Sequence, residues 1–565
     1  MMNKAINHLV IATEDSLKNL KKFGSTALAT TLVATSVFTS AATAGNVDNG
    51  VTHVSDGGTD YIFNAAAKDL DINTSAIMGV NVGDITDNSI TGDIDIITAA
   101  SSTTAADATI TIGSITMDAG NTPGVMTIVD ADDQTGSLTV NVTGNLIHDG
   151  TLTVTTLEDT DDELLTVDVG GTVNIAGAVE IVAGGSGVTG DISMNVSAAA
   201  VTFTAGIDLA DVSTTGSSTL QVDGAVAQTV TGAIDGDAAG EGTLIIDNTH
   251  ASGATIATAL GGNNRLKLVN ISATDSTATF AAAVSSTTIT NLGTATITGA
   301  VAADTINNSG TLTMTAATDG VAGALTTVNL KTQDATVLFN GTGAVDMDLL
   351  IAADVDGYGT LNFIDSDDNA ASTNTTSAGD IGASAKKIGT INIGSATKAG
   401  NLTTINDDAI FASAINITGG NAAAEDSILD LHENIGDADD LVAIVLTDNA
   451  GDAELDVGTV STVFGTIDGT AGTAGDGSST IDANAALTVS GNIGATNVVE
   501  ALEIGDTTTL KGVTNTITAT TFTADDVLNI SGTAAQTLTT TITATNEEGE
   551  LNIVNATHLV TIAGT

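Results

Sequence analysis

The sequence predicts an all-β fold, an elongated right-handed parallel β-solenoid (β-helix) of irregular repeats, on three observations. A short module of glycine, threonine and alternating apolar residues returns many times. Aromatic residues make up only 2% of the 565 residues, and Pro123 is the only proline. After residue 45 no stretch has a convincing helical period, the two segments worth noting being Ala423 to Leu431 and Ala438 to Ile444.

The module predicts one strand at each of its copies. It reads GTLTVTT from Gly150, GTLTMTA from Gly310, GTLNFID from Gly359 and GTINIGS from Gly389. Each copy alternates with a period of two, which turns one set of side chains inward and the other outward. Threonine and valine suit such half-buried strands, and the Gly, Asn and Asp residues between copies favour turns.

The spacing between copies is irregular, which argues against a repeat of fixed length and favours a solenoid with loops inserted between strands. A coil of about 20 residues, typical of leucine-rich-like repeats, predicts about 25 coils. A row of tandem β-sandwich domains is the alternative, since short strands with turn signals are typical of sandwiches too. The solenoid is favoured because no linkers between domains are seen.

Composition separates the chain from disordered and disulfide-bonded proteins. Hydrophobic residues make up 42% of the chain, and the mean hydropathy is +0.28. Disordered chains are poor in the β-branched residues that dominate here. The absence of cysteine excludes disulfides and thiolate metal sites. Stability must therefore come from the backbone network or from bound ions.

Residues 1–44 are predicted to be a signal peptide, and residues 45–565 a repetitive, β-rich passenger or surface region. Four lysines precede an apolar, threonine-rich stretch, which is too short for a confident membrane span. The small residues Ala42, Thr43 and Ala44 then form a cleavage pattern. We expect cleavage between Ala44 and Gly45, which makes the protein an exported one.

Removing residues 1–44 leaves a strongly acidic chain. Four of the 12 basic residues and two of the 68 acids go with it, so 66 acids face 8 bases and the net charge is −58. Such a surface repels nucleic acid and anionic lipid and attracts cations. The sequence thus predicts no nucleic-acid partner and an affinity for cations.

The stretch ADVDGYGTLNFIDSDD, from Ala353 to Asp368, can be interpreted as a calcium loop or as a strand. An EF-hand needs flanking helices, an oxygen ligand at the fifth loop position and a glutamate at the twelfth; here those positions hold Tyr358 and Asp365. The strand is therefore the favoured interpretation. Calcium binding at the acid-rich turns beside it is the metal hypothesis, with ligands Asp354, Asp356, Asp365 and Asp367.

No other pattern predicts a catalytic or cofactor-binding residue. The GxGxxG match from Gly185 to Gly190 is followed by a strand-like run, whereas a dinucleotide site needs a helix there. The histidines after residue 45 are isolated in sequence and are expected at the surface. A solenoid that cleaves acidic polysaccharides needs basic groups, yet Arg265 is the only arginine. The chain is therefore predicted not to be an enzyme.

The repeated GTLTM, GTINI and GTLNF units, together with the segment from Lys386 to Gly420, resemble passenger regions of bacterial autotransporters. The chain is most similar in style to the rickettsial outer membrane protein B type of surface antigen, over most of residues 120–565. The resemblance implies a location at the cell surface or outer membrane and a role in coating or adhesion. Family members end in a translocator barrel, which we do not find before Thr565.

Three functions remain open at this point. The first is an exported structural component of a surface layer or coat, stabilised by calcium, whose partners are further copies or cell-envelope components. The second is an autotransporter passenger adhesin, whose translocator barrel is missing from this chain and whose partner is a host or neighbouring-cell surface. The third is a polysaccharide-active β-helix enzyme, for which few residues are available.

Overall fold

The described residues form β-strands joined by turns, and no helix occurs among them. The structure is a computed structural model, and all the residues that it describes belong to one unit, Gly45–Thr565. The described ranges are 45–47, 52–54, 61–63, 68–73, 79–87, 92–97, 108–117, 124–130, 137–156, 164–184, 190–212, 216–315, 326–340, 345–346, 349–364, 372–376, 381–398, 401–405, 409–423, 425–470, 478–523, 526–544, 549–554 and 558–564.

The strands pair into five sheets, named A to E here, of which sheet A has 18 strands. Its strands are β1 (Gly45–Val47), β3 (Tyr61–Phe63), β6 (Ile85–Asp87), β9 (Ile115–Met117), β12 (Leu146–His148), β15 (Val173–Ile175), β18 (Ala200–Phe203), β21 (Gln228–Thr231), β24 (Ala254–Ile256), β26 (Thr277–Phe280), β28 (Thr294–Ile297), β30 (Thr311–Met314), β32 (Thr336–Phe339), β35 (Tyr358–Phe363), β37 (Ile388–Ile393), β39 (Ala412–Thr418), β41 (Val442–Thr447) and β44 (Gly465–Thr470).

Sheets B and C cover the first part of this unit and have 12 and 8 strands. Sheet B contains β5 (Gly79–Val82), β8 (Ala108–Ile112), β11 (Leu138–Val142), β14 (Leu164–Val169), β17 (Asp191–Val196), β20 (Ser218–Gly224), β23 (Glu241–Asn248), β25 (Leu266–Ile271), β27 (Val284–Asn291), β29 (Val301–Asn308), β31 (Thr326–Leu330) and β34 (Leu349–Ala353). Sheet C contains β2 (Thr52–Val54), β4 (Lys68–Asn73), β7 (Gly92–Ile97), β10 (Val125–Asp130), β13 (Thr151–Thr156), β16 (Val179–Ala183), β19 (Ile207–Asp211) and β22 (Ile234–Gly236).

Sheets D and E cover the later part and have 10 and 5 strands. Sheet D contains β33 (Val345–Asp346), β36 (Ser372–Thr376), β38 (Asn401–Ile405), β40 (Ser427–Leu431), β42 (Ala453–Val457), β45 (Ser479–Ala483), β47 (Val499–Ile504), β49 (Thr514–Phe522), β51 (Gln536–Ala544) and β53 (Val560–Ala563). Sheet E contains β43 (Ser461–Val463), β46 (Leu487–Val489), β48 (Thr508–Leu510), β50 (Val527–Ile530) and β52 (Glu550–Ile553).

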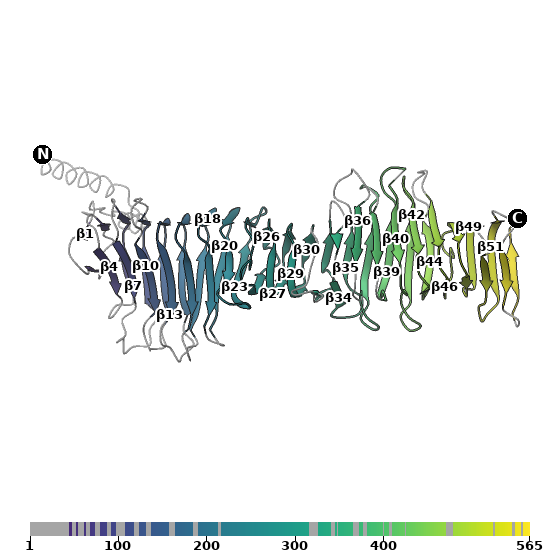
Figure 1. Ribbon diagram of the computed structural model, residues 1–565, viewed down its shortest axis with the longest axis horizontal. Coiled ribbons are helices and arrows are strands. Elements are labelled where there is room, and N and C mark those ends of the chain that lie inside the picture. Colours follow the sequence, from purple (N-terminus) through teal and green to yellow (C-terminus); the bar gives the residue numbers. More distant parts are fainter. Residues whose placement is uncertain are drawn as a thin grey trace, which may run out of the picture. The chain divides into compact units, whose positions relative to one another are not determined.

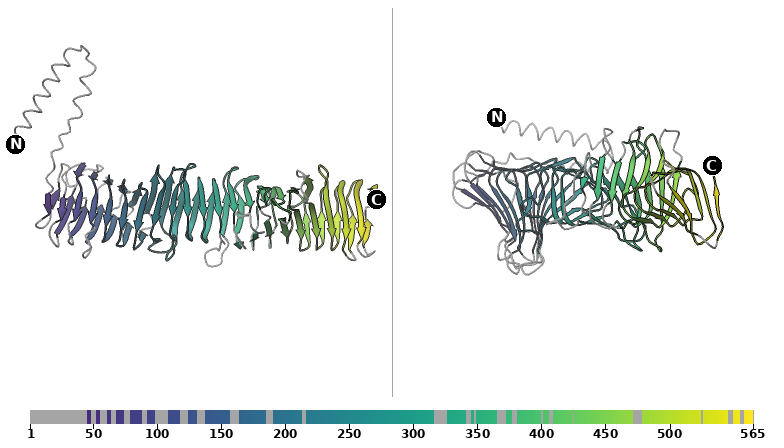
Figure 2. Two further views of the ribbon diagram at one scale, coloured as in Figure 1. Left: turned by 90° about the horizontal axis from the view of Figure 1, so that it is seen from above. Right: turned by 45° about the vertical axis from the view of Figure 1, so that its right-hand side comes forward.

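A strand pairs with its counterpart one coil later, and the pairs are parallel. In sheet A, for example, β26 pairs with β28 and β28 with β30, while β27 and β29 pair with each other in sheet B. Figures 1 and 2 show the strands following one another coil by coil in the order of the sequence. This is a parallel β-solenoid, as predicted. The β-sandwich alternative is wrong, because sandwich sheets are antiparallel.

The coils differ in length, and the expected coil of about 20 residues is wrong as a general value. The side chains of Asn291 and Asn308 meet one coil apart and are 17 residues apart in sequence. Asp168 and Asn195 are 27 residues apart, and Asn362 and Asn392 are 30 apart. Longer coils mean fewer of them than the expected 25. Turns of variable length absorb the difference, while the strands keep their register.

Single buried residues continue the stacking where no regular strand forms. Isolated parallel bridges link Ile351 of β34 through Ile381, Ile410 and Ile435 to Val463 of β43. Sheets B and E are thus successive parts of one stack, and all five side chains are at most 1% exposed. Parallel bridges from β44 through Ile493 to β49 connect sheets A and D in the same way.

The core is a narrow layer of aliphatic side chains between the sheets. In β13 the residues alternate between half-buried and buried, with Leu152 and Val154 both inaccessible to solvent. Stacking places like residues over one another: the rings of Phe339 and Phe363 lie one coil apart with centroids 4.8 Å from each other. A thin core of this kind explains how the chain folds with few aromatic residues.

The GTLNFID stretch forms a strand, so the strand interpretation is confirmed and the helix-loop-helix one is wrong. Gly359 lies in β35 with a φ of +78°. A Cβ at this position would clash with the Leu330 side chain, in addition to the cost of the left-handed backbone. The two segments noted for a helical period also contain strands, β40 and β41.

Buried amide side chains bind the backbone where strands begin. Gln536 Nε2 donates to the carbonyl oxygens of Leu510 and Gly512 at 3.2 and 2.9 Å, and Gln536 Oε1 accepts from the Gly532 amide at 2.7 Å. Gln228 donates in the same way to Val196 and Ala198. Each glutamine side chain therefore forms hydrogen bonds with backbone groups of a neighbouring coil.

We expect Leu220→Ala to destabilise the solenoid by about 2–5 kcal/mol, because it leaves a cavity in a fully buried column. Leu220 lies in β20 between Met194 and Leu244, and all three side chains are inaccessible to solvent. Urea denaturation with hydrogen exchange of β17, β20 and β23 measures the loss. The adjacent outward substitution Thr219→Ala is the control, expected to change stability by less than about 0.5 kcal/mol. Equal effects of the two would contradict the assigned inward and outward faces.

Candidate functional site

Parallel stacking in register turns every outward position into a column of side chains. Neighbouring strands of a sheet lie about 4.8 Å apart, so the residues of a column follow one another at that interval. A residue type that recurs at one position of successive strands therefore builds a continuous surface feature. The candidate functional features of this protein are columns of this kind.

Four acids form a column on sheet D. Asp430 of β40 pairs in register with Asp456 of β42, Asp456 with Asp482 of β45, and Asp482 with Glu503 of β47. All four strands bury the residues on either side of these acids, so the carboxylates lie on the outer face. Four like charges at about 4.8 Å repel one another unless they bind protons or cations.

Glu454 lies beside this sheet D acid column, two residues before Asp456. Burial of its carboxyl raises the pKa of Glu454 from 4.5 to about 7, and the negative charges of Asp482, Asp456, Asp426 and Asp452 add to the effect. Its partners in register are Ile428 and Thr480, which bring no compensating charge. Glu454 therefore changes its protonation near neutral pH, unlike an ordinary glutamate.

An amide spans two members of the column. Asn484 Nδ2 donates to Asp456 Oδ1 and to Asp482 Oδ2, both at 3.0 Å. Burial raises the pKa of Asp482, as does the charge of Asp456, while the bond from Asn484 lowers it. At the near end of the column, His432 Nε2 lies 3.1 Å from Asp430 Oδ1. These neutral or titratable partners reduce the repulsion only locally.

A shorter acid column lies on sheet C. Glu180 of β16 pairs in register with Asp208 of β19, and Asp208 with Asp235 of β22. Burial raises the pKa of Asp208, and the charges of Asp235, Asp237 and Glu180 raise it further. Asn263 binds Asp235 through its backbone amide at 3.2 Å and through Nδ2 at 2.8 Å. Stacked acids thus occur on more than one sheet.

Sheet B repeats the pattern at Asp223. Asp223 of β20 pairs with Asp247 of β23. The pKa of Asp223 is raised by burial first, and then by the charges of Asp168 and Asp247.

Several of the basic residues hold turns of neighbouring coils together. Lys387 Nζ lies 3.4 Å from Asp440 Oδ1, and Asp440 Oδ2 accepts from Ser384 Oγ at 2.7 Å and from the Ala385 amide at 2.9 Å. The bonds from Ser384 and Ala385 lower the pKa of Asp440, desolvation opposes them, and Lys387 lowers the pKa further. Ala385 has a φ of 62°, so this turn is held in a conformation that alanine rarely adopts.

The other ion pairs have a similar structural role. Arg265 and Asp304 are 2.8 Å apart, and Lys267 lies 3.6 Å from Asp211. The arginine and its nearby lysine are therefore both paired with acids. They do not form the basic surface that an acidic polysaccharide substrate would require.

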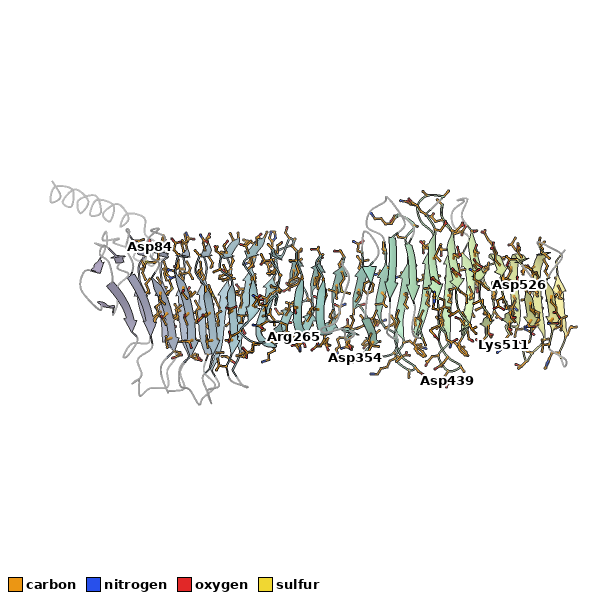
Figure 3. The ribbon with its side chains drawn as sticks, viewed as in Figure 1. Asp84, Arg265, Asp354, Asp439, Lys511 and Asp526 are labelled. Carbon is orange, nitrogen blue, oxygen red and sulfur yellow. The ribbon has the colours of Figure 1, made fainter. Side chains whose placement is uncertain are left out.

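The structure places two of the four predicted calcium ligands. Asp354 lies at the lower edge of the stack in Figure 3, where its Oδ1 is 3.6 Å from Lys331 Nζ. Asp356 Oδ1 accepts from the backbone amide of Lys387 at 3.0 Å. Asp365 and Asp367 lie outside the described residues. The calcium hypothesis for this turn stays a prediction.

Within the described ranges, no three His, Asp or Glu side chains are grouped so as to hold a metal ion. The acids that stack are instead distant in sequence, and columns of them were not predicted. Ala44 lies outside the described residues, and β1 begins at Gly45, the residue predicted to follow the cleavage site.

The structure also bears on the GxGxxG motif and on the expected surface position of the histidines. The strand β17 begins directly after Gly190, where a dinucleotide site would need a helix, while residues 185–189 of the glycine motif lie outside the described part. His148 is not at the surface as expected: it is 1% exposed, and its Nε2 lies 3.2 Å from the Thr151 carbonyl oxygen. As the last residue of β12, it takes an inward position of the alternating pattern.

No family model, curated protein or solved structure matches this chain. In the part of the chain that is described, no helix has the length and hydropathy of a membrane span.

We expect Glu454 to make the solenoid less stable at alkaline pH. Its pKa is higher in the folded than in the unfolded chain, so its contribution is fully present below about pH 4.5 and is lost as the pH rises through about 7. Glu454→Gln, which cannot ionise, should raise the melting temperature at pH 8 and leave it unchanged at pH 4. Thermal unfolding across this range measures the difference between variant and wild type.

Glu550→Gln, at an exposed position of β52, removes the same charge outside the column and is the control for Glu454→Gln. It should leave the pH dependence of the wild type nearly intact. An identical pH profile for Glu454→Gln and the wild type would contradict the assigned role of Glu454.

We expect Asp440→Ala to lower the melting temperature at pH 7, because it releases Ser384, the Ala385 amide and Lys387 together. Since the pKa of Asp440 is lowered in the folded state, its contribution is present at neutral pH and is lost as the pH falls through that lowered value. The difference between variant and wild type should therefore shrink in acid. Asp439→Ala, at the exposed neighbour, is the control. A melting temperature equal to that of the control would contradict the role of Asp440 in holding this turn.

Proposed function

We propose that this chain is an exported structural protein of a cell surface, a component of a coat or surface layer built from a β-solenoid. The observation that carries the proposal is the set of acid columns on a stack of parallel strands. A stack of this kind satisfies its backbone hydrogen bonds from coil to coil and presents the same residue type repeatedly along its length. That combination suits a structural surface better than a single reaction centre.

Export rests on residues 1–44. Their lysines, apolar stretch and Ala-Thr-Ala end form the pattern of a signal peptide. The absence of cysteine is compatible with either redox environment, since stability rests on stacking rather than on disulfides. Identification of Gly45 as the N-terminal residue of the protein recovered from the cell surface would support this part of the proposal.

Calcium would act along the acid columns as a counter-ion. Carboxylate oxygens are the ligands that calcium prefers, and a divalent ion can bridge acids of one copy or of two. The described acids do not form a closed coordination site, so the proposed role is charge neutralisation along a column. The partners would then be further copies of the chain or anionic components of the cell envelope.

An autotransporter passenger adhesin is the second candidate. The parallel solenoid and the repeated GTLTM, GTLNF and GTINI units favour it, because they carry the resemblance to passenger regions. Its partner would be a host or neighbouring-cell surface. A passenger needs no contact between copies, so the state of assembly separates the two candidates.

We expect Gly45–Thr565 to form ordered sheets or tubes in calcium and to lose them in chelator, as measured by negative-stain electron microscopy. Sodium chloride at the same ionic strength is the control for screening of charge. Asp456→Asn with Asp482→Asn should reduce the calcium requirement, whereas Asp304→Asn should not. Separate particles with and without calcium would contradict the surface layer and favour the passenger adhesin.

A further inference from the structure

Sheet A carries a column of six threonines in register. They occupy one outward position of β26, β28, β30, β32, β35 and β37, and each pairs with the next along the stack. The column consists of Thr277, Thr294, Thr311, Thr336, Thr360 and Thr390. Four of them, Thr294, Thr311, Thr360 and Thr390, directly follow the glycine of the repeated module, so the sequence repeat contributes most of this repeated surface.

A second outward column runs beside the first, two residues later in each strand. Over the same six strands it contains three threonines, one leucine and two asparagines: Thr279, Thr296, Thr313, Leu338, Asn362 and Asn392. Asn392 Nδ2 donates to Asn362 Oδ1 at 2.7 Å, which fixes the orientation of these amides. The two columns together are called the threonine face here.

The hydroxyls of this face are available to solvent. Thr294 and Thr311 are exposed, and the others are half-buried. Among the described residues, only Thr336 of the first column bonds to the protein through its hydroxyl, to the Asp334 carbonyl oxygen at 3.3 Å. Threonines in turns differ, as Thr298 shows by donating to the Phe280 carbonyl oxygen at 3.1 Å.

The threonine face carries no charge, although the chain contains 68 acids. None of its twelve positions is acidic, basic or aromatic. The sheet D and sheet C acid columns have the opposite character. The face therefore has no charges that would bind a cation or a charged polymer. It also has no aromatic ring on which the sugars of a polysaccharide could stack. The face suits an uncharged partner with a regular repeat.

Strand geometry fixes the dimensions of the array. Threonines of one column are about 4.8 Å apart, and the two columns are about 6.6 Å apart, twice the rise per residue. Both intervals are close to the repeats of oxygen atoms on the prism faces of hexagonal ice. The β-branched side chain has few rotamers, so methyl and hydroxyl groups are held in place before binding. Waters bridged by such hydroxyls would join a growing ice lattice with little further ordering.

We propose that the threonine face binds ice. The partner is the crystal surface of water itself, held by hydroxyls and amides at the lattice interval and by the methyl groups between them. This function is additional to the structural role proposed above and does not depend on assembly or on calcium. An ice-binding face would work equally on a surface coat and on a separate molecule.

Thermal hysteresis and ice shaping, measured on Gly45–Thr565 in chelator, test the proposal. We expect the wild type to shape ice crystals and to lower their growth temperature. Thr311→Lys places a long charged side chain in the middle of the face and should abolish both effects. Thr311 is exposed, so this variant should keep the circular dichroism and melting temperature of the wild type.

Thr153→Lys is the matched control, because Thr153 is an outward threonine of β13 that lies outside the threonine face, with Thr127 and Glu180 as its neighbours in register. It should retain full ice activity. A wild type without ice shaping, or equal losses in both variants, would overturn the proposal. The proposal would also be overturned if the wild type had no effect on ice but associated with itself, and if Thr311→Lys disrupted that self-association. The threonine face would then serve contacts between copies.

Discussion

Hydrogen bonding between parallel strands in register is the interaction on which the rest of this structure depends. Each strand pairs with its counterpart one coil later, so a residue's neighbours are set by coil length and not by sequence proximity. Inward positions become aliphatic columns, and outward positions become columns of polar residues. The stacked rings of Phe339 and Phe363 and the stacked carboxylates of Asp456 and Asp482 follow from the same register.

Stacking polar residues in columns has two consequences: like charges repel one another, and uncharged residues form a repeated surface. Burial is the first cause of the raised pKa values of Glu454, Asp482 and Asp208, and repulsion by neighbouring acids raises these pKa values further. Stacked threonines carry no charge and have no such cost, and one column of them extends through six strands. The surface therefore carries two kinds of feature. The acid columns attract protons and cations, and the uncharged threonine face attracts neither.

The sequence was sufficient to predict the fold class, because modules such as GTLTMTA carry the alternation of a half-buried strand in every copy. Coil length could not be predicted, since turns of different length give steps as different as 17 and 30 residues. The acid columns were missed for the same reason: Asp430, Asp456 and Asp482 meet only once the register is known. Conversely, Asp354 and Asp356 are close in sequence, yet bind different partners.

The distance between Thr277 and Thr390 tests the parallel register most directly. The two residues are five strand pairings apart along one column of sheet A. Because the chain has no cysteine, spin labels on Thr277→Cys and Thr390→Cys would report this distance alone. Double electron–electron resonance should give a narrow distribution of the distance between the two labels, centred at about 24 Å, which is five strand spacings. A broad distribution, or a mean far from that value, would contradict the in-register stack.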